Sequence, residues 1–182
     1  ALEKALGRCE LDKIKLIVID GVFSMEGDIA NLPEIVKLAE KYNANIMVDD
    51  AHGLGVLGKN GSGTADHFGL TDKVDLIMGT FSKSLASIGG FIAADNDTIN
   101  YLKHNARSLI FSASIAPANA ASVIAAVDLI QNEPERTKNL WDSTHYALAS
   151  LKAAGFDTGH SVTPIIPILI RDDYKTFQLT KL

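Results

Sequence analysis

Short β-rich segments alternate with helical segments in the first half of this chain, which restricts the folds open to it. Apolar runs of the length of buried strands occur at residues 14–19, 45–49, 74–78 and 90–94. After the first run, apolar residues recur at helical spacing from Leu32 to Ala39, with Asn31 as N-cap and Glu34 three residues later. This order predicts an α/β fold, with a mostly parallel sheet covered by helices on both faces in three layers.

The second half of the chain has a helical pattern. We expect helices at residues 98–107, 116–131 and 133–154, and the near absence of charge from the second predicts that it is buried on most sides. Residues 165–170 have the pattern of an edge strand flanked and interrupted by prolines. We place a domain boundary near residue 133. Residues 1–133 then form part of a large domain that includes the connecting helix, and residues 134–182 begin a smaller α+β domain.

Composition restricts the class of protein further. The chain has 182 residues, of which 47% are hydrophobic and 21% charged, with a net charge of −5, so no nucleic-acid-binding surface is indicated. Cys9 is the only cysteine, which excludes an internal disulfide and favours a reducing, cytoplasmic location. No apolar run approaches the roughly 20 residues that span a bilayer. The chain begins inside a helix–turn–strand unit and ends soon after the 165–170 segment, so we expect it to be a fragment.

Polar clusters follow the predicted strands at three places: residues 20–24, 49–52 and 80–83. The carboxyl ends of parallel strands meet at one edge of a sheet, where α/β proteins bind ligands. We therefore expect the three clusters to lie close together, although they are far apart in the sequence.

Lys83 is the most informative residue of these clusters. It lies in a turn of small residues, Gly79 to Ser84, directly after an apolar strand, where an amine is well placed to reach a ligand. Pyridoxal 5′-phosphate (PLP) needs a lysine for its Schiff base and an acid at its pyridine nitrogen. Asp49 can supply that acid, and His52 lies in the same cluster. Lys83 would act as a nucleophile from a partly desolvated site.

Residues with hydroxyl groups provide the remaining contacts of the predicted PLP site. Ser24 is available near the phenolic oxygen of the cofactor, and Thr80 and Ser82 can donate to its phosphate. Each of these residues also has an ordinary structural interpretation as a cap or turn residue, as have Asp49 and His52.

Two further patterns resemble parts of other binding sites, and neither is complete. Residues 53–58 match G-x-G-x-x-G after a strand, as in a dinucleotide-binding loop, but residues 59–63 are turn-rich where a helix should follow. Asp49, Asp50 and His52 could be metal ligands, but no second cluster of His or Cys completes the set.

Three segments in order resemble the α-oxoamine synthases, PLP-dependent enzymes of the type I transferase fold. The segments are Gly21-Val22-Phe23-Ser24-Met25-Glu26-Gly27-Asp28, Val48-Asp49-Asp50-Ala51-His52-Gly53 with the glycines that follow, and Gly79-Thr80-Phe81-Ser82-Lys83. The resemblance covers nearly the whole chain. The segment from Gly79 to Ser84, followed by Gly89-Gly90-Phe91, is most similar to the bacterial serine palmitoyltransferase branch.

The resemblance implies roles for individual residues. Lys83 would hold the cofactor and move a proton at the substrate Cα, Asp49 would pair with the pyridine nitrogen, and His52 would contact the phenolic oxygen. Ser24 would lie near the same oxygen, and three hydroxyl residues would approach phosphate: Thr80, Ser82 and, across a subunit interface, Ser112.

The resemblance also implies an activity. Family members are homodimers that condense an amino acid with an acyl-CoA, usually with loss of CO₂; 8-amino-7-oxononanoate synthase and glycine C-acetyltransferase are alternative branches. Family segments that carry a ring-stacking histidine, a phosphate loop and a carboxylate-binding arginine are absent from these 182 residues. We therefore expect the chain alone neither to hold PLP tightly nor to turn over. An aminotransferase, a nucleotide-binding module and a non-catalytic interaction domain remain alternative interpretations.

Overall fold

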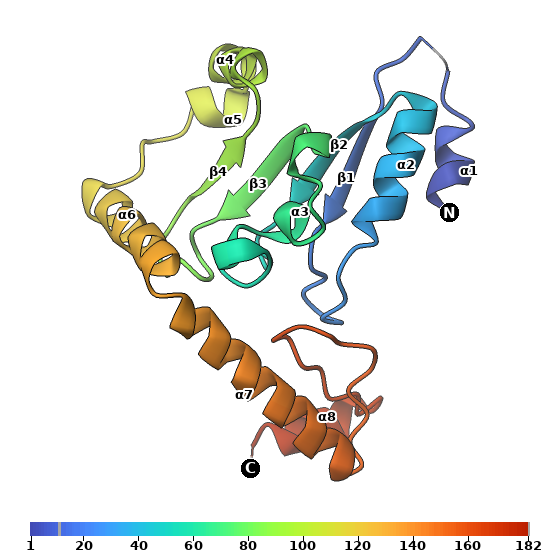
Figure 1. The fold of residues 1–182 in the computed structure, drawn as a ribbon, viewed down its shortest axis with the longest axis vertical. Helices are drawn as coiled ribbons and strands as arrows, with labels where there is room; N and C mark the ends of the chain where they lie inside the picture. Colours follow the sequence, from blue (N-terminus) through green and yellow to red (C-terminus); the bar gives the residue numbers. More distant parts are fainter. Residues whose placement is uncertain (11, 182) are drawn as a thin grey trace.

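The computed structural model describes residues 1–10 and 12–181, and its centre is a four-stranded sheet (Figure 1). The strands are β1 (Leu16–Asp20), β2 (Asn45–Asp49), β3 (Leu76–Thr80) and β4 (Gly90–Ala93). They lie in the order β1-β2-β3-β4, with the first three parallel and β4 antiparallel to β3. The mostly parallel sheet predicted from the alternation is confirmed.

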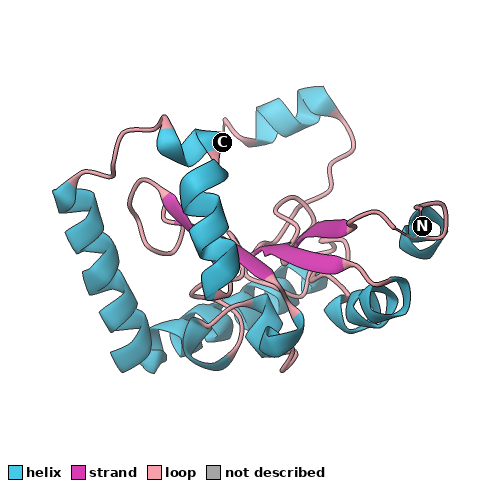
Figure 2. Ribbon diagram, turned by 90° about the horizontal axis from the view of Figure 1, so that it is seen from above, coloured by secondary structure: helices cyan, strands magenta, loops and turns pink. Residues whose placement is uncertain are grey.

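Helices surround this sheet (Figure 2). They are α1 (Leu2–Leu6), α2 (Leu32–Tyr42), α3 (Thr64–His67), α4 (Asn96–Asn105), α5 (Arg107–Ile110), α6 (Pro117–Asn132), α7 (Pro134–Ala153) and α8 (Asp173–Leu179), with 3₁₀ turns η1 (Lys59–Gly61) and η2 (Thr71–Lys73). Helix α2 begins as predicted, because Asn31 Oδ1 accepts a hydrogen bond from the Glu34 N–H at 3.4 Å. It ends at Asn43 in the left-handed conformation, with φ of 50°.

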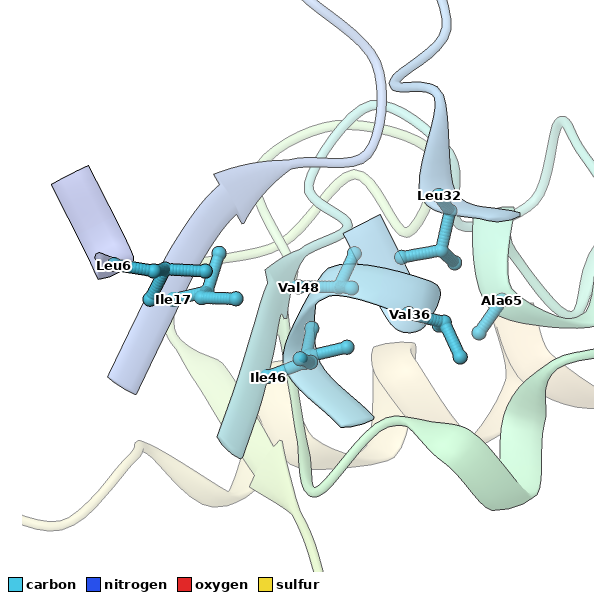
Figure 3. Packing of buried hydrophobic residues seen from close by; sticks show 8 residues of the cluster. Leu6, Ile17, Leu32, Val36, Ile46, Val48 and Ala65 are labelled. Atoms are coloured by element: carbon cyan, nitrogen blue, oxygen red, sulfur yellow. The ribbon is translucent and has the colours of Figure 1, made fainter. Parts of the chain in front are cut away.

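The hydrophobic core lies on one face of the sheet (Figure 3). Its buried residues come from the strands β1 and β2 and the helices α1, α2 and α3: Leu6, Ile17, Leu32, Val36, Ala39, Ile46, Val48 and Ala65. On the opposite face of β1, Leu16 and Val18 are 50% and 59% exposed. Among the described residues, the helices that pack on β1 lie on the core side.

Two expectations for the second half of the chain are wrong. None of the residues of α6 is buried, and Ile124 is 65% exposed. Apolar residues occur all round this helix, so any side without a packing partner exposes them. Residues 165–170 form no strand. A strand needs a neighbour to complete its hydrogen bonds, and the backbone bond from Leu169 N–H to the Asp157 carbonyl does not extend into a ladder. Leu182, the end of the predicted second domain, lies outside the described residues.

Hydrogen bonds between distant segments join the second half of the chain to the first, and two of them come from side chains of α7 and of the loop at residues 161–165. The indole N–H of Trp141, in α7, donates to the Val56 carbonyl at 3.0 Å. The Thr163 hydroxyl donates to the Gly27 carbonyl at 2.9 Å. These contacts bring α7 and the loop at residues 161–165 close to the ends of the parallel strands. Within residues 1–10 and 12–181, no helix combines the length and apolarity needed to cross a bilayer.

Candidate functional site

His52 and Lys83 meet at the carboxyl end of the sheet, as the strand order predicts. His52 follows β2 and Lys83 follows β3, and the Lys83 Nζ lies 2.5 Å from the His52 Nε2. Both side chains line a cavity of about 250 Å³. The rest of its wall comes from the loops after β1 and β2, the β3–β4 turn, α7 and the 161–165 loop: Val22, Leu54, Gly55, Val56, Ser84, Leu140, Thr163, Pro164 and Ile165.

The backbone after β2 folds into a tight turn that fixes His52. The Asp50 carbonyl accepts hydrogen bonds from the N–H groups of Gly53 and Leu54, at 3.1 and 3.0 Å. The Asp49 carboxylate accepts one from the Ala51 N–H at 3.1 Å. His52 is thus held between backbone bonds on both sides, with Asp49 at the last position of the strand.

The turn after β3 is organised by hydroxyl groups. The Thr80 Oγ1 accepts a hydrogen bond from the Ser82 N–H at 3.3 Å, and the two hydroxyl oxygens lie 2.9 Å apart. The Ser84 hydroxyl donates to the Leu54 carbonyl at 2.8 Å, which ties this turn to the one that carries His52. Thr80 and Ser82 are therefore close together beside Lys83, as predicted.

The charge on His52 depends on this environment. Burial and the neighbouring Lys83 ammonium lower the pKa of the imidazole, and Asp49 and Asp20 oppose them. The imidazole is therefore mainly neutral at neutral pH, so its Nε2 can accept a hydrogen bond from Lys83 in the appropriate tautomer. A neutral imidazole beside an amine can hold or pass a proton.

Asp50 is a residue whose importance the sequence interpretation missed. It is 3% exposed, and both carboxylate oxygens bind Thr64. Burial raises the pKa of the Asp50 carboxyl, against the hydrogen bonds from Thr64 that lower it. The glycines at positions 21, 53 and 63 were a signal, because a group packed between them needs close approach to the backbone.

Other predicted site residues lie elsewhere. Ser24 is exposed in the turn after β1. Ser112 is exposed, and its hydroxyl bonds to the Ser108 carbonyl. It lines a different depression, of about 670 Å³, beside Gly89 and Gly90. The expectation that Lys83 is partly desolvated is wrong for the described residues, because the open cavity leaves Lys83 exposed.

The alternative site patterns have clear outcomes. Residues 53–58 form turns and bends and are followed by η1, so the α-helix that should directly follow a dinucleotide-binding loop does not occur there. Among residues 1–10 and 12–181, no group of three or more His, Cys, Asp or Glu side chains could hold a metal ion.

Comparisons with known proteins cover nearly the whole chain. The sequence model of the aminotransferase class I and II family matches residues 1–181. The chain is 65% identical over 181 residues to the serine palmitoyltransferase of Bacteroides thetaiotaomicron, covering 100% of the chain and 46% of that protein. It is 49% identical over 180 residues to the 8-amino-7-oxononanoate synthase of Thermosipho melanesiensis, covering 99% of the chain and 46% of that protein. The chain thus spans about half the length of these relatives.

Solved structures have the same fold. Serine palmitoyltransferase from S. paucimobilis, with a bound PLP–myriocin aldimine, superposes with a TM-score of 0.90 at 34% identity, over 96% of the chain and 46% of that structure. The 8-amino-7-oxononanoate synthase from Francisella tularensis, at 22% identity, has a TM-score of 0.84 over 99% of the chain and 53% of that structure, which supports the fold alone.

Proposed function

Because this chain belongs to the aminotransferase class I and II family, we propose that the protein containing it is a PLP-dependent acyltransferase. In this proposal it condenses an amino acid with an acyl-CoA and releases CoA and CO₂, as a serine palmitoyltransferase does. The observation that carries the proposal is the convergence of Lys83 and His52, 2.5 Å apart, at the ends of β2 and β3. The identity to serine palmitoyltransferases, 60–65% over 181 residues, favours that branch.

The residues at the strand ends fit PLP. The cofactor needs a reachable primary amine, a carboxylate for its pyridine nitrogen and donors for its phosphate. Lys83 is exposed to the cavity that it lines, and Asp49 ends the neighbouring strand. The hydroxyl groups of Thr80 and Ser82 lie 2.9 Å apart in the turn that carries Lys83. These four residues would hold the cofactor. Ser24 and Ser112 lie away from them, and would contact the cofactor only together with further segments of the intact protein.

The side chains themselves account for the steps that the chain would perform. PLP, when bound, would accept electrons from the bonds at the amino acid Cα. Lys83 would hold the cofactor until the amino acid replaces it, and its released amine would then move a proton at Cα. His52 would accept a hydrogen bond from that amine and position the incoming groups. Val22, Leu54 and Ile165 would limit the access of water to this side of the cavity.

The lysine assignment has a direct test in the intact protein. Borohydride reduction should fix PLP to the peptide that contains Lys83, and Lys83→Ala should remove both the label and the visible absorbance of bound cofactor. Lys59→Ala, at an exposed lysine of the neighbouring loop, should keep both. If the variant at 83 kept the label on the same peptide, the assignment would be wrong.

The preferred substrates determine to which branch of the family the intact protein belongs. We propose serine with a long-chain thioester, and 8-amino-7-oxononanoate synthase is the second candidate, because relatives of that name reach 49–51% identity. Release of CoA should be measured with serine, glycine and alanine, each with short and long thioesters. Preference for alanine and a shorter thioester would favour the second candidate.

Two related proposals concern assembly and location. We propose a homodimer with the site at its interface, to be tested by measuring the mass of the intact protein in solution. The 182-residue chain alone should bind PLP weakly, and a stable borohydride-fixed adduct on it would contradict this. A cytoplasmic location, expected from the single cysteine, stays a prediction.

A further inference from the structure

We propose that Asp50 is a positioning residue, whose carboxylate fixes the turn that carries His52 and so sets the imidazole against Lys83. The proposal depends on the proposed function only for its effect on turnover. Asp50 itself does not line the cavity that His52 and Lys83 share. Its action would therefore be through His52.

The Asp50 side chain is buried, and both of its carboxylate oxygens accept hydrogen bonds from Thr64. Its Oδ2 accepts a hydrogen bond from the Thr64 N–H at 2.7 Å, and its Oδ1 accepts one from the Thr64 hydroxyl at 2.6 Å. Thr64 is fully buried and is the first residue of α3. The pair therefore joins the end of β2 to the beginning of the helix that contributes Ala65 to the core.

Three glycines surround this carboxylate, each from a different turn. A Cβ added at Gly21, which follows β1, would lie 2.7 Å from the carboxylate. A Cβ at Gly53 would lie 1.9 Å from it, and one at Gly63 would lie 2.0 Å from it. Any side chain at these positions would displace Asp50, so the carboxylate fills a space that only glycines leave open.

The backbone of Asp50 forms hydrogen bonds both to β3, which leads to Lys83, and to the turn that carries His52. Its N–H donates to the Met78 carbonyl of β3 at 2.8 Å, and its carbonyl accepts from Gly53, directly after His52. Among residues 1–10 and 12–181, the charge that acts on Asp50 is that of Asp49, which has the same sign, and no ion pair compensates for the burial. A buried carboxyl group at this point is explained by the precision that its hydrogen bonds to Thr64 give the turn.

Two substitutions of Asp50 separate geometry from charge. In Asp50→Asn, the amide oxygen can accept from the Thr64 N–H and the amide nitrogen can donate to the Thr64 hydroxyl, so the geometry is kept without the charge. Asp50→Ala removes both contacts and leaves the Thr64 N–H unpaired. We expect the asparagine variant to have about the same kcat as the wild type. The alanine variant should lose about 10²-fold in kcat, the typical cost of a small misplacement.

The decisive measurement is the pKa of His52, followed by NMR in the intact protein without cofactor. The charged groups that act on His52 are Lys83, Asp49 and Asp20. If Asp50→Ala moves the imidazole away from Lys83 and into solvent, the pKa of His52 rises toward its ordinary value, and Asp50→Asn leaves it unchanged. A merely structural role would lower the melting temperature without moving this pKa in the folded protein. Because no PLP is needed, this result is independent of the proposed function.

Thr64 provides a second route if Asp50→Ala does not fold. Thr64→Val keeps the shape and the N–H but removes the hydroxyl donor, and it should raise the pKa of His52 less than Asp50→Ala would. Thr64→Ser restores the donor and should return the wild-type value. The proposal is overturned if Thr64→Val leaves this pKa unchanged, if Asp50→Ala only lowers the melting temperature, or if Asp50→Asn shifts the pKa as much as Asp50→Ala.

Discussion

All twelve buried apolar residues in the described part of the chain lie between Leu6 and Leu85, whereas those buried beyond residue 96 are polar. The latter are Thr144, Thr158, Ser161 and Thr163. The first region, up to Leu85, therefore surrounds a hydrophobic core, and the second, beyond residue 96, is joined to it in part by hydrogen bonds and has no buried apolar residue among those described. This difference teaches that the candidate site combines a half built beside the hydrophobic core, which carries His52 and Lys83, with a half whose described residues include no buried apolar one and which contributes Leu140 and residues 163–165.

The largest difference between the regions should come from truncating apolar side chains. Leu32 is 0% exposed, and Leu32→Ala should lower the free energy of unfolding by about 2–5 kcal/mol, through lost burial and the cavity left behind. Ile124, in α6, is 65% exposed, and Ile124→Ala should change it by about 0.5 kcal/mol or less. Denaturant unfolding of the intact protein measures both. Equal losses would mean that α6 is buried in the intact protein. They would contradict the difference in apolar burial between the two regions.

The next effect concerns the contact between the regions. Gly27 has φ of 73°, and a Cβ there would lie 2.3 Å from the Ile165 carbonyl oxygen. Gly27→Ala should combine left-handed strain of about 1–2 kcal/mol with displacement of the 161–165 loop. Gly69, with φ of 66° and open space around it, provides the matched control for strain alone.

Hydrogen exchange distinguishes these two glycine variants. The Val162 N–H, which donates to the Gly27 carbonyl at 3.4 Å, should exchange faster in Gly27→Ala than in Gly69→Ala. Similar exchange in both would show that this loop is held by something other than its contact with Gly27.

The sequence predicted those features that depend on local pattern. The strands β1 to β3 and the capping of α2 by Asn31 follow from a few neighbouring residues. The approach of His52 to Lys83 follows from parallel strands, whose carboxyl ends share one edge. Contacts between distant segments carry no such signal: Trp141 and Val56 are 85 positions apart, and Thr163 and Gly27 are 136 apart.

The incorrect expectations have a common cause. Residues 165–170 have the composition of a strand, but a strand also needs a partner, and composition does not supply one. Helix α6 has the composition of a buried helix, but burial depends on what packs on it. By sequence alone, Asp50 is a possible metal ligand beside Asp49 or a cap of the next turn, because the sequence does not show that Thr64 and three glycines converge on it.

A smaller effect is expected from the polar contact of the second region. Thr163→Val removes the hydroxyl that donates to the Gly27 carbonyl but keeps the side-chain volume, and it should cost about 1 kcal/mol. Thr163→Ser keeps the donor and serves as the control. Denaturant unfolding gives the loss, and a wild-type value for the valine variant would mean that this bond does not hold the two regions together.

The smallest effect is expected from an exposed ion pair within the first region. The Glu3 carboxylate lies 2.7 Å from the Lys41 Nζ, which joins α1 to α2, and this lysine lowers the pKa of Glu3. A carboxyl group whose pKa is lower in the folded state stabilises the fold above its unfolded value, about 4.3, and loses this contribution as the pH falls through the folded value. The melting temperature of the wild type should therefore exceed that of Glu3→Gln slightly at neutral pH, and the difference should shrink under acidic conditions and with added salt. A large difference at neutral pH that persists at high salt would show that the first region depends on its ion pairs as well as on its core.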